Sequence, residues 1–152
     1  MTLGSKVPDF SLAATGGGSF RLKDMAGKKL VIYFYPKDMT AGCTQESQNF
    51  RDLHAAFRKA GARIVGVSRE GVGSHEKFKS REQLPFELLA DEDSRVCKLF
   101  DVIHEKSMYG RKYLGIVRST FLLDGAAVLR REWRKVKVPG HAEEVLEAAQ
   151  SL

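Results

Sequence analysis

Two cysteines, Cys43 and Cys97, are the residues of this chain best suited to covalent chemistry. Cys43 closes the segment Pro36-Lys-Asp-Met-Thr-Ala-Gly-Cys43, in which Pro36 and Thr40 precede it at a fixed spacing. The reactive form of a cysteine is the thiolate, and an ordinary thiol with a pKa of about 8.5 is only about 3% ionised at pH 7. A site that uses Cys43 as a nucleophile therefore has to stabilise its anion.

The residues before Cys43 predict that it lies in the first turn of a helix. Residues 30–35 are apolar throughout, which is typical of a buried central strand, and Pro36 ends that strand. Thr40 is a suitable N-cap, so we expect the helix to begin near Ala41. Backbone N–H groups are unpaired there, and the helix dipole stabilises an anion by about 0.3–2 kcal/mol. Lowering a thiol pKa to about 6 takes roughly 3.4 kcal/mol, so a second cation has to contribute.

The strand and helix around Cys43 extend into a βαβ unit. Phe50, Leu53 and Phe57 repeat at helical spacing and place Cys43 on the same inward face. A second apolar strand follows at residues 62–68. In a unit of this kind, the loops that carry functional residues lie at the carboxyl ends of the parallel strands. Cys43 lies at that end.

The rest of the chain predicts short elements of an α/β fold, with a central sheet flanked by helices. Thr15-Gly-Gly-Gly18 predicts the turn of an N-terminal β-hairpin rather than a phosphate loop, because no Gly-Lys-Ser/Thr follows it. The further expected elements are strands at residues 86–89 and 119–123, helical stretches at 74–83, 94–100 and 139–152, an irregular segment at 104–113, and an exposed strand within 128–138.

Length and composition are those of one globular domain, residues 1–152. The 152 residues can bury an ordinary core without disulfides or metal, and 43% hydrophobic with 29% charged residues is a globular composition. The two cysteines are far apart and form no CxxC, which indicates a reducing compartment and disfavours a metal ribbon or dithiol exchange. We therefore expect a cytoplasmic protein with no metal and no cofactor, and we expect neither a signal peptide nor a membrane span.

The positive charge of the chain does not indicate a nucleic-acid partner. The net charge is +6 and the isoelectric point is about 9.4. The densest basic cluster is Arg130-Arg-Glu-Trp-Arg-Lys-Val-Lys137, in a segment that predicts a solvated strand face. No helix-turn-helix, zinc finger or aromatic RNA-binding motif accompanies it.

The pattern Pro36-x-x-x-Thr40-x-x-Cys43 resembles the signature of the peroxiredoxins, which are thiol peroxidases with a thioredoxin-like fold built on a mixed sheet. Five further blocks resemble, in order, the PrxQ branch, also called bacterioferritin comigratory proteins, and together they cover nearly the whole chain. These blocks are Pro8-Asp-Phe10, Tyr35-Pro-Lys-Asp38, Leu89-Ala-Asp-Glu-Asp93, Glu105-Lys-Ser-Met-Tyr-Gly110 and Gly115-Ile-Val-Arg-Ser-Thr-Phe-Leu122.

The resemblance implies that the Cys43 thiolate attacks a hydrogen peroxide or organic hydroperoxide oxygen and becomes a sulfenic acid. Thr40 would hydrogen-bond to the peroxide, and the backbone N–H groups of Gly42 and Cys43 would hold its oxygens. No metal or flavin is implied.

Three further residues take supporting roles by the same resemblance. Arg118, directly before Ser119, corresponds to an arginine that lies over the reactive sulfur, which would make it the second cation. Pro36 would shield the sulfur from bulk water. Glu46 resembles the carboxylate that positions this arginine, although a solvated helix charge would also fit its place in the sequence.

Members of the branch usually carry a second cysteine, which resolves the sulfenic acid, at one of two positions. This chain has no cysteine at either position. Gln48 stands five residues after Cys43, and Lys79 occupies the alternative place on the following helix. Ala41 also stands where the family commonly has proline. Cys97 is then the remaining internal partner, in an apolar context that also fits a core residue. The sulfenic acid would be reduced either by Cys97 or by an outside thiol, such as thioredoxin, glutaredoxin or glutathione.

Other functions remain open at this point. A peroxide sensor or a holdase would use the same cysteine without multiple turnover. Gly66-Val-Ser68 begins a pattern like that of serine hydrolases, but Gly71 comes one residue too late to complete it. The resemblance to the PrxQ branch implies that the protein is a monomer or a weak dimer.

Overall fold

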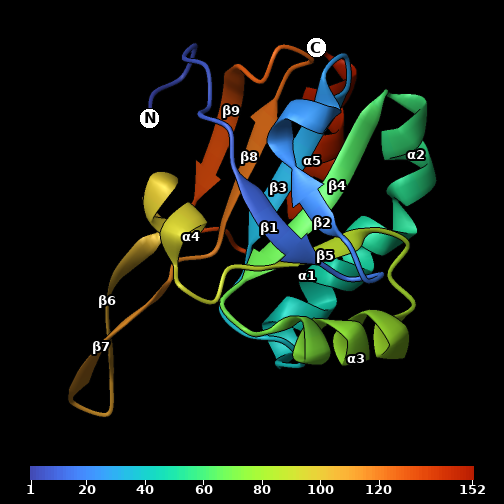
Figure 1. Cartoon of the computed structure of the whole chain (residues 1–152). Coiled ribbons are helices and arrows are strands. Elements are labelled where there is room, and N and C mark those ends of the chain that lie inside the picture. Colours follow the sequence, from blue (N-terminus) through green and yellow to red (C-terminus); the bar gives the residue numbers. More distant parts are fainter.

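A seven-stranded mixed sheet forms the centre of the computed structural model, which describes residues 1–152 (Figure 1). Its strands are β1 (Ser11–Ala14), β2 (Ser19–Arg21), β3 (Lys29–Phe34), β4 (Ala62–Ser68), β5 (Glu87–Ala90), β8 (Ser119–Leu123) and β9 (Leu129–Arg134), in the order β2-β1-β5-β4-β3-β8-β9. β3, β4 and β5 are parallel, and the pairs on either side of them are antiparallel. This confirms the α/β class, the N-terminal hairpin and the βαβ unit.

Helices cover both faces of this sheet. They are η1 (Leu22–Met25), α1 (Ala41–Asp52), α2 (His54–Lys59), α3 (Val72–Glu82), α4 (Arg95–Leu99) and α5 (His141–Gln150). One apolar core lies between the sheet and α1, α2, α3 and α5, and a second core lies between the opposite face and α4, η1 and the N-terminal segment. None of the helices is both long enough and apolar enough to cross a membrane.

The central strand β3 contributes to both cores, as the uninterrupted apolar run predicted. Leu30, Ile32 and Phe34 point into one core, whereas Val31 and Tyr33 point into the other. Side chains alternate between the two faces of a strand, so a strand buried on both faces must be apolar at every position. The sheet thus divides the interior into two separate cores.

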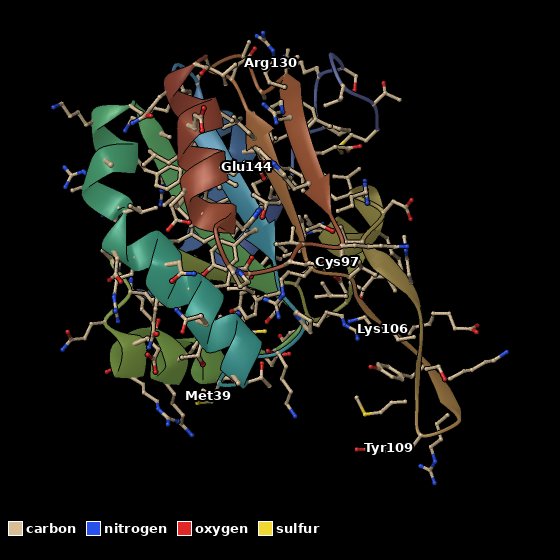
Figure 2. All side chains as sticks on the ribbon, turned by 180° about the vertical axis from the view of Figure 1, so that it is seen from behind. Met39, Cys97, Lys106, Tyr109, Arg130 and Glu144 are labelled. Carbon is tan, nitrogen blue, oxygen red and sulfur yellow. The ribbon has the colours of Figure 1, made fainter.

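Two predictions about secondary structure were wrong. Residues expected to be irregular form a hairpin of β6 (Ile103–Met108) and β7 (Arg111–Ile116), which pair only with each other and project from the body, with Tyr109 at the tip (Figure 2). Tyr109 is 98% exposed, and the hairpin lacks the alternating apolar face that reveals a core strand. The helix expected to run on through Phe57 is interrupted at Leu53, where α1 ends and α2 begins.

Candidate active site

Cys43 lies in the first turn of α1, as predicted, and its side chain is buried at 1% exposure. Helix α1 begins at Ala41, and its first backbone hydrogen bond is donated by the Thr44 N–H to the Thr40 carbonyl. The N–H groups of Gly42 and Cys43 precede that bond and take no part in the helical ladder. Two donors and the positive end of the helix dipole therefore lie beside the sulfur.

Arg118, which directly precedes β8, brings a full positive charge to the sulfur. Its Nη2 donates to Cys43 Sγ at 3.4 Å, and its Nη1 donates to Glu46 Oε1 at 2.7 Å. Burial lowers the pKa of Arg118, but Glu46 and Cys43 outweigh burial, so its pKa lies above the ordinary value. The guanidinium thus stays charged and spans the thiol and the carboxylate.

Gly42 makes room for this arginine. A Cβ atom at this position would lie only 3.1 Å from Arg118 Nη2. A larger residue would therefore force the guanidinium to shift away from the start of α1, so glycine at position 42 permits the close approach of Arg118.

Glu46 is a carboxylate buried in the interior of the protein. It lies one turn after Cys43 on the buried face of α1, with 1% exposure, and its Oε2 has no hydrogen-bond partner. Burial raises its pKa from 4.5 to about 7, although Arg118 acts in the opposite direction. The alternative of a solvated helix charge is wrong, because the carboxylate is buried against Arg118.

Replacing this carboxylate by an amide, Glu46→Gln, should remove a pH dependence of stability. The folded pKa of about 7 exceeds the ordinary 4.5, so between these values the folded state keeps a proton that the unfolded state has lost. Stability of the wild type should therefore fall as pH rises through this range, by up to about 3 kcal/mol. Urea unfolding from about pH 5 to about pH 8 measures this, with the exposed Glu147→Gln as control. Parallel curves for wild type and Glu46→Gln would contradict it.

Thr40 and Pro36 lie in the loop between β3 and α1. Thr40 is the N-cap residue, but the predicted side-chain cap is absent: its hydroxyl donates to the Lys37 carbonyl at 2.8 Å. That bond uses the hydroxyl hydrogen and leaves the oxygen lone pairs free to accept. Thr40 is exposed at the start of α1, and Pro36 is half-buried directly after β3. The shielding role of Pro36 stays a prediction.

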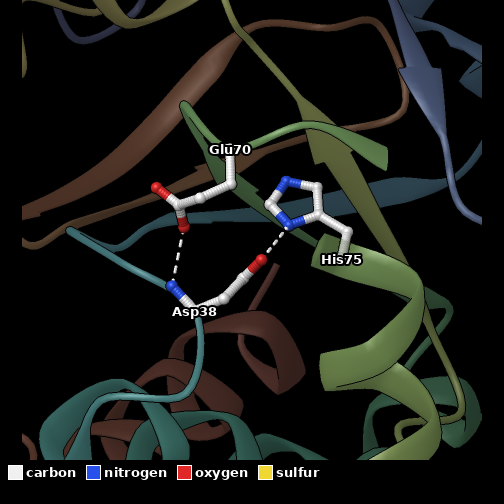
Figure 3. A group of neighbouring side chains, drawn as sticks. All are labelled: Asp38, Glu70 and His75. Carbon is white, nitrogen blue, oxygen red and sulfur yellow. Dashed lines mark hydrogen bonds and ion pairs between the residues drawn. The ribbon is translucent and has the colours of Figure 1, made fainter. Parts of the chain in front are cut away.

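A buried polar cluster, which no sequence pattern predicted, fixes the same loop (Figure 3). Asp38, which is 4% exposed, accepts hydrogen bonds from Tyr35, Ser74 and His75 at 2.6, 2.8 and 2.6 Å. The Asp38 N–H donates to Glu70 at 2.6 Å. Asp38 and its partner Tyr35 belong to the block Tyr35-Pro-Lys-Asp38, which was the one available signal, whereas the other partners come from α3 and the loop before it.

Comparison with known proteins agrees with this geometry. Residues 3–132 match a model of the AhpC/TSA family, and Peroxiredoxin Bcp of Xanthomonas campestris is 51% identical over 140 residues, which are 92% of this chain and 88% of that protein. The chain is a peroxiredoxin of the AhpC/TSA family. Peroxiredoxin Bcp of Bacillus subtilis is 45% identical over 99% of this chain and 96% of its own.

Solved structures place this peroxiredoxin in the PrxQ branch. It is similar to Peroxiredoxin Q of Xanthomonas campestris, with a TM-score of 0.90 and 50% identity over 93% of this chain and 90% of that one. It is also similar to a PrxQ variant of Xylella fastidiosa, with a TM-score of 0.94 and 41% identity over 99% and 96% of the two chains. The thioredoxin-like fold and the thiol-dependent peroxidase class expected from the sequence are both confirmed.

The second cysteine of the peroxiredoxin lies in the other core. Cys97, on α4, is fully buried in the core opposite to the one that contains Cys43. Burial raises the pKa of the Cys97 thiol, and the neighbouring Asp91 raises it further. Cys97 is therefore a buried thiol with the central sheet between it and Cys43.

The serine of the hydrolase-like pattern has a structural partner in this peroxiredoxin. Ser68 ends β4, is fully buried, and donates from its hydroxyl to Glu70 at 2.9 Å. A nucleophilic serine needs a neighbouring base and an approach for substrate. Ser68 instead holds the carboxylate that accepts the Asp38 N–H.

Proposed function

We propose that this peroxiredoxin reduces hydrogen peroxide and organic hydroperoxides with Cys43 as its nucleophile. The observation that carries the proposal is the contact of Arg118 Nη2 with Cys43 Sγ at 3.4 Å, at the unpaired N–H groups of α1. A related structure concerns the alkyl peroxide reduction activity of the Xanthomonas campestris bacterioferritin comigratory protein; this chain is 49% identical to it, with a TM-score of 0.89. That likeness supports organic as well as inorganic peroxides.

In the proposed reaction, the Cys43 thiolate attacks the terminal oxygen of the hydroperoxide. A sulfur–oxygen bond forms while the oxygen–oxygen bond breaks, so sulfur is oxidised to sulfenic acid and the peroxide is reduced. The other oxygen leaves with negative charge and takes up a proton to become water or an alcohol. Arg118 and the N–H groups of Gly42 and Cys43 stabilise this developing charge.

Thr40 would act as the acceptor in this reaction. Its hydroxyl hydrogen is engaged by the Lys37 carbonyl, so the oxygen can accept the hydrogen bond of the peroxide O–H. That contact would orient the peroxide with its oxygen–oxygen bond directed at the sulfur, while Pro36 limits access of water from the loop side.

An external thiol completes the proposed cycle. The sulfenic acid and one thiol form a mixed disulfide and release water, and a second thiol then releases the Cys43 thiol and leaves with the first as a disulfide. Cys97 lies in the opposite core, so an internal disulfide would require passage across the central sheet. Thioredoxin, glutaredoxin and glutathione are the candidate reductants.

Intact mass after one equivalent of peroxide tests this one-cysteine cycle. Wild type and Cys97→Ser should both become about sixteen mass units heavier, as expected for a sulfenic acid. A wild-type product about two units lighter, missing from Cys97→Ser, would contradict the proposal and show internal resolution. Continuous peroxide consumption with excess thiol separates the enzyme from a sensor or holdase, which would stop after one event.

The proposal also covers the compartment and the oligomeric state in which the protein acts. We propose that residues 1–152 act as one domain in the cytoplasm, as a monomer or weak dimer. Both cysteines are free, which suits a reducing compartment.

A further inference from the structure

The loop between β3 and α1 is fixed from its buried side by the Asp38 carboxylate. Oδ1 accepts the Tyr35 hydroxyl, and Oδ2 accepts both the Ser74 hydroxyl and the His75 imidazole. These three bonds tie the loop to the end of β3 and to the first turn of α3 (Figure 3). The carboxylate therefore joins the loop before Cys43 to two separate elements.

Both ring nitrogens of His75 have a buried partner. Its Nε2 lies 2.9 Å from the Leu89 carbonyl oxygen, which can only accept, so Nε2 carries a hydrogen. Its Nδ1 lies 2.6 Å from Asp38 Oδ2. Burial raises the pKa of Asp38, but the bonds from His75, Tyr35 and Ser74 outweigh burial, so its pKa lies below the ordinary value. The His75 ring thus bridges β5 and the Asp38 carboxylate.

This pairing places a histidine ring and a carboxylate together in the interior. The side chains of His75 and Asp38 are 0% and 1% exposed. A buried hydrogen-bonded pair is strongly sensitive to loss of one member, because the other polar group is then left buried without its partner. Glu70, which is half-buried, accepts the Asp38 N–H and the Ser68 hydroxyl at its Oε1. Both Asp38 oxygens, both His75 ring nitrogens and Glu70 Oε1 already take part in hydrogen bonds, so we describe the three side chains as a hydrogen-bonded network rather than as a metal centre.

The network supports an unfavourable backbone conformation next to the catalytic residues. Met39 has a φ of +62°, in the left-handed region that side chains other than glycine rarely adopt. Asp38 precedes Met39 and is anchored by both its side chain and its N–H. Thr40 follows Met39, and its hydroxyl donates to the Lys37 carbonyl. Release of Asp38 would let Met39 relax and would shift Thr40 and the start of α1 together.

We propose that His75 and Asp38 are positioning residues for peroxide reduction, because their buried hydrogen-bonded pair holds residues 36–40 so that Thr40 and the first N–H groups of α1 face the Cys43 sulfur. This inference rests on the proposed role of Cys43. Neither residue touches the peroxide in this scheme. Their effect is on the geometry of the groups that do, where an error of about 1 Å can cost about a hundredfold in rate.

Two amide variants of His75 separate the two hydrogen bonds of its ring. The side-chain nitrogen of His75→Asn can take the place of Nδ1 and still donate to Asp38, whereas that of His75→Gln reaches toward Leu89 instead. We expect the second-order rate constant with hydrogen peroxide to fall about tenfold or more in His75→Gln and to recover most of its value in His75→Asn. Phe20→Leu, in the opposite core, serves as a variant that loses stability without touching the loop.

Alkylation of Cys43 by iodoacetamide provides the readout that a merely structural role would not give. The positioning role predicts a lower rate with peroxide and a nearly unchanged alkylation rate in His75→Gln, because Arg118 still faces the sulfur. A proportional loss of both rates, or a wild-type peroxide rate in both His75 variants, would overturn the proposal. Peroxidase activity remaining in Cys43→Ser would instead overturn the assignment of Cys43, on which the inference rests.

Nitrogen chemical shifts of the wild-type ring test this pairing even where a variant fails to fold. A hydrogen on Nε2 of His75 is expected, because the Leu89 carbonyl can only accept. A ring whose Nε2 carries no hydrogen would overturn the pairing.

Discussion

Replacement of Cys43 by serine should reduce the peroxidase rate by more than about a thousandfold, because removing a nucleophile removes the reaction itself. A serine hydroxyl fills nearly the same buried space in α1, but it is not ionised at neutral pH and cannot form a sulfenic acid. Stopped-flow mixing of the reduced variant with hydrogen peroxide, followed through peroxide consumption, measures the loss.

Cys97→Ser is the matched control for this experiment. It removes the same atom from the opposite core, and it should keep a rate close to that of the wild type when excess thiol is present. Unfolding by urea shows whether either serine has disturbed the fold. A Cys43→Ser variant with more than a tenth of the wild-type rate would refute the catalytic assignment.

Removal of the guanidinium in Arg118→Ala should lower the rate constant with peroxide by about 10²–10³-fold, as loss of one preorganised donor does in other enzymes. Arg118 is the charged donor 3.4 Å from the sulfur, and it is also the sole hydrogen-bond partner of Glu46. The variant should lose stability as well, since Glu46 is left buried without a partner.

A double variant separates these two effects of Arg118→Ala. Adding Glu46→Gln removes the isolated carboxylate, so Arg118→Ala/Glu46→Gln should regain much of the stability that Arg118→Ala loses. The rate with peroxide should stay low, because the donor to the sulfur is still missing. Recovery of the rate together with the stability would show that Arg118 acts through the fold alone.

The elements that could be predicted from the sequence are those whose burial is visible in the pattern of hydrophobic residues. The strand over residues 62–68 was predicted within its observed bounds, because β4 is apolar on both faces. The projecting hairpin was missed, because β6 and β7 bury little and pair only with each other. The break at Leu53 was missed for a different reason: Phe50 and Phe57 face the same core, so the apolar period continues across it.

Site residues that lie within one short motif could be predicted from the sequence. Those that the fold brings together from distant parts of the chain could be predicted only in part. Cys43 and Glu46 lie one turn apart on α1, and the family resemblance supplied Arg118 from another part of the chain. His75 gave no such signal, because a histidine in a polar helix with low hydrophobicity suggests a solvent-exposed side chain. Its partner Asp38 is 37 residues away, and the packing of α3 against β5 and α1 brings the two together.

The division of the interior by the central sheet has a consequence for the lifetime of the enzyme under the proposed one-cysteine cycle. In that cycle the sulfenic acid of Cys43, with Cys97 in the other core, persists until a thiol from solution reduces it, and meanwhile a second peroxide can oxidise it irreversibly to sulfinic acid. The odds of that loss in each cycle depend on the ratio of peroxide to thiol around the protein. The number of turnovers before inactivation is therefore governed by the supply of reductant.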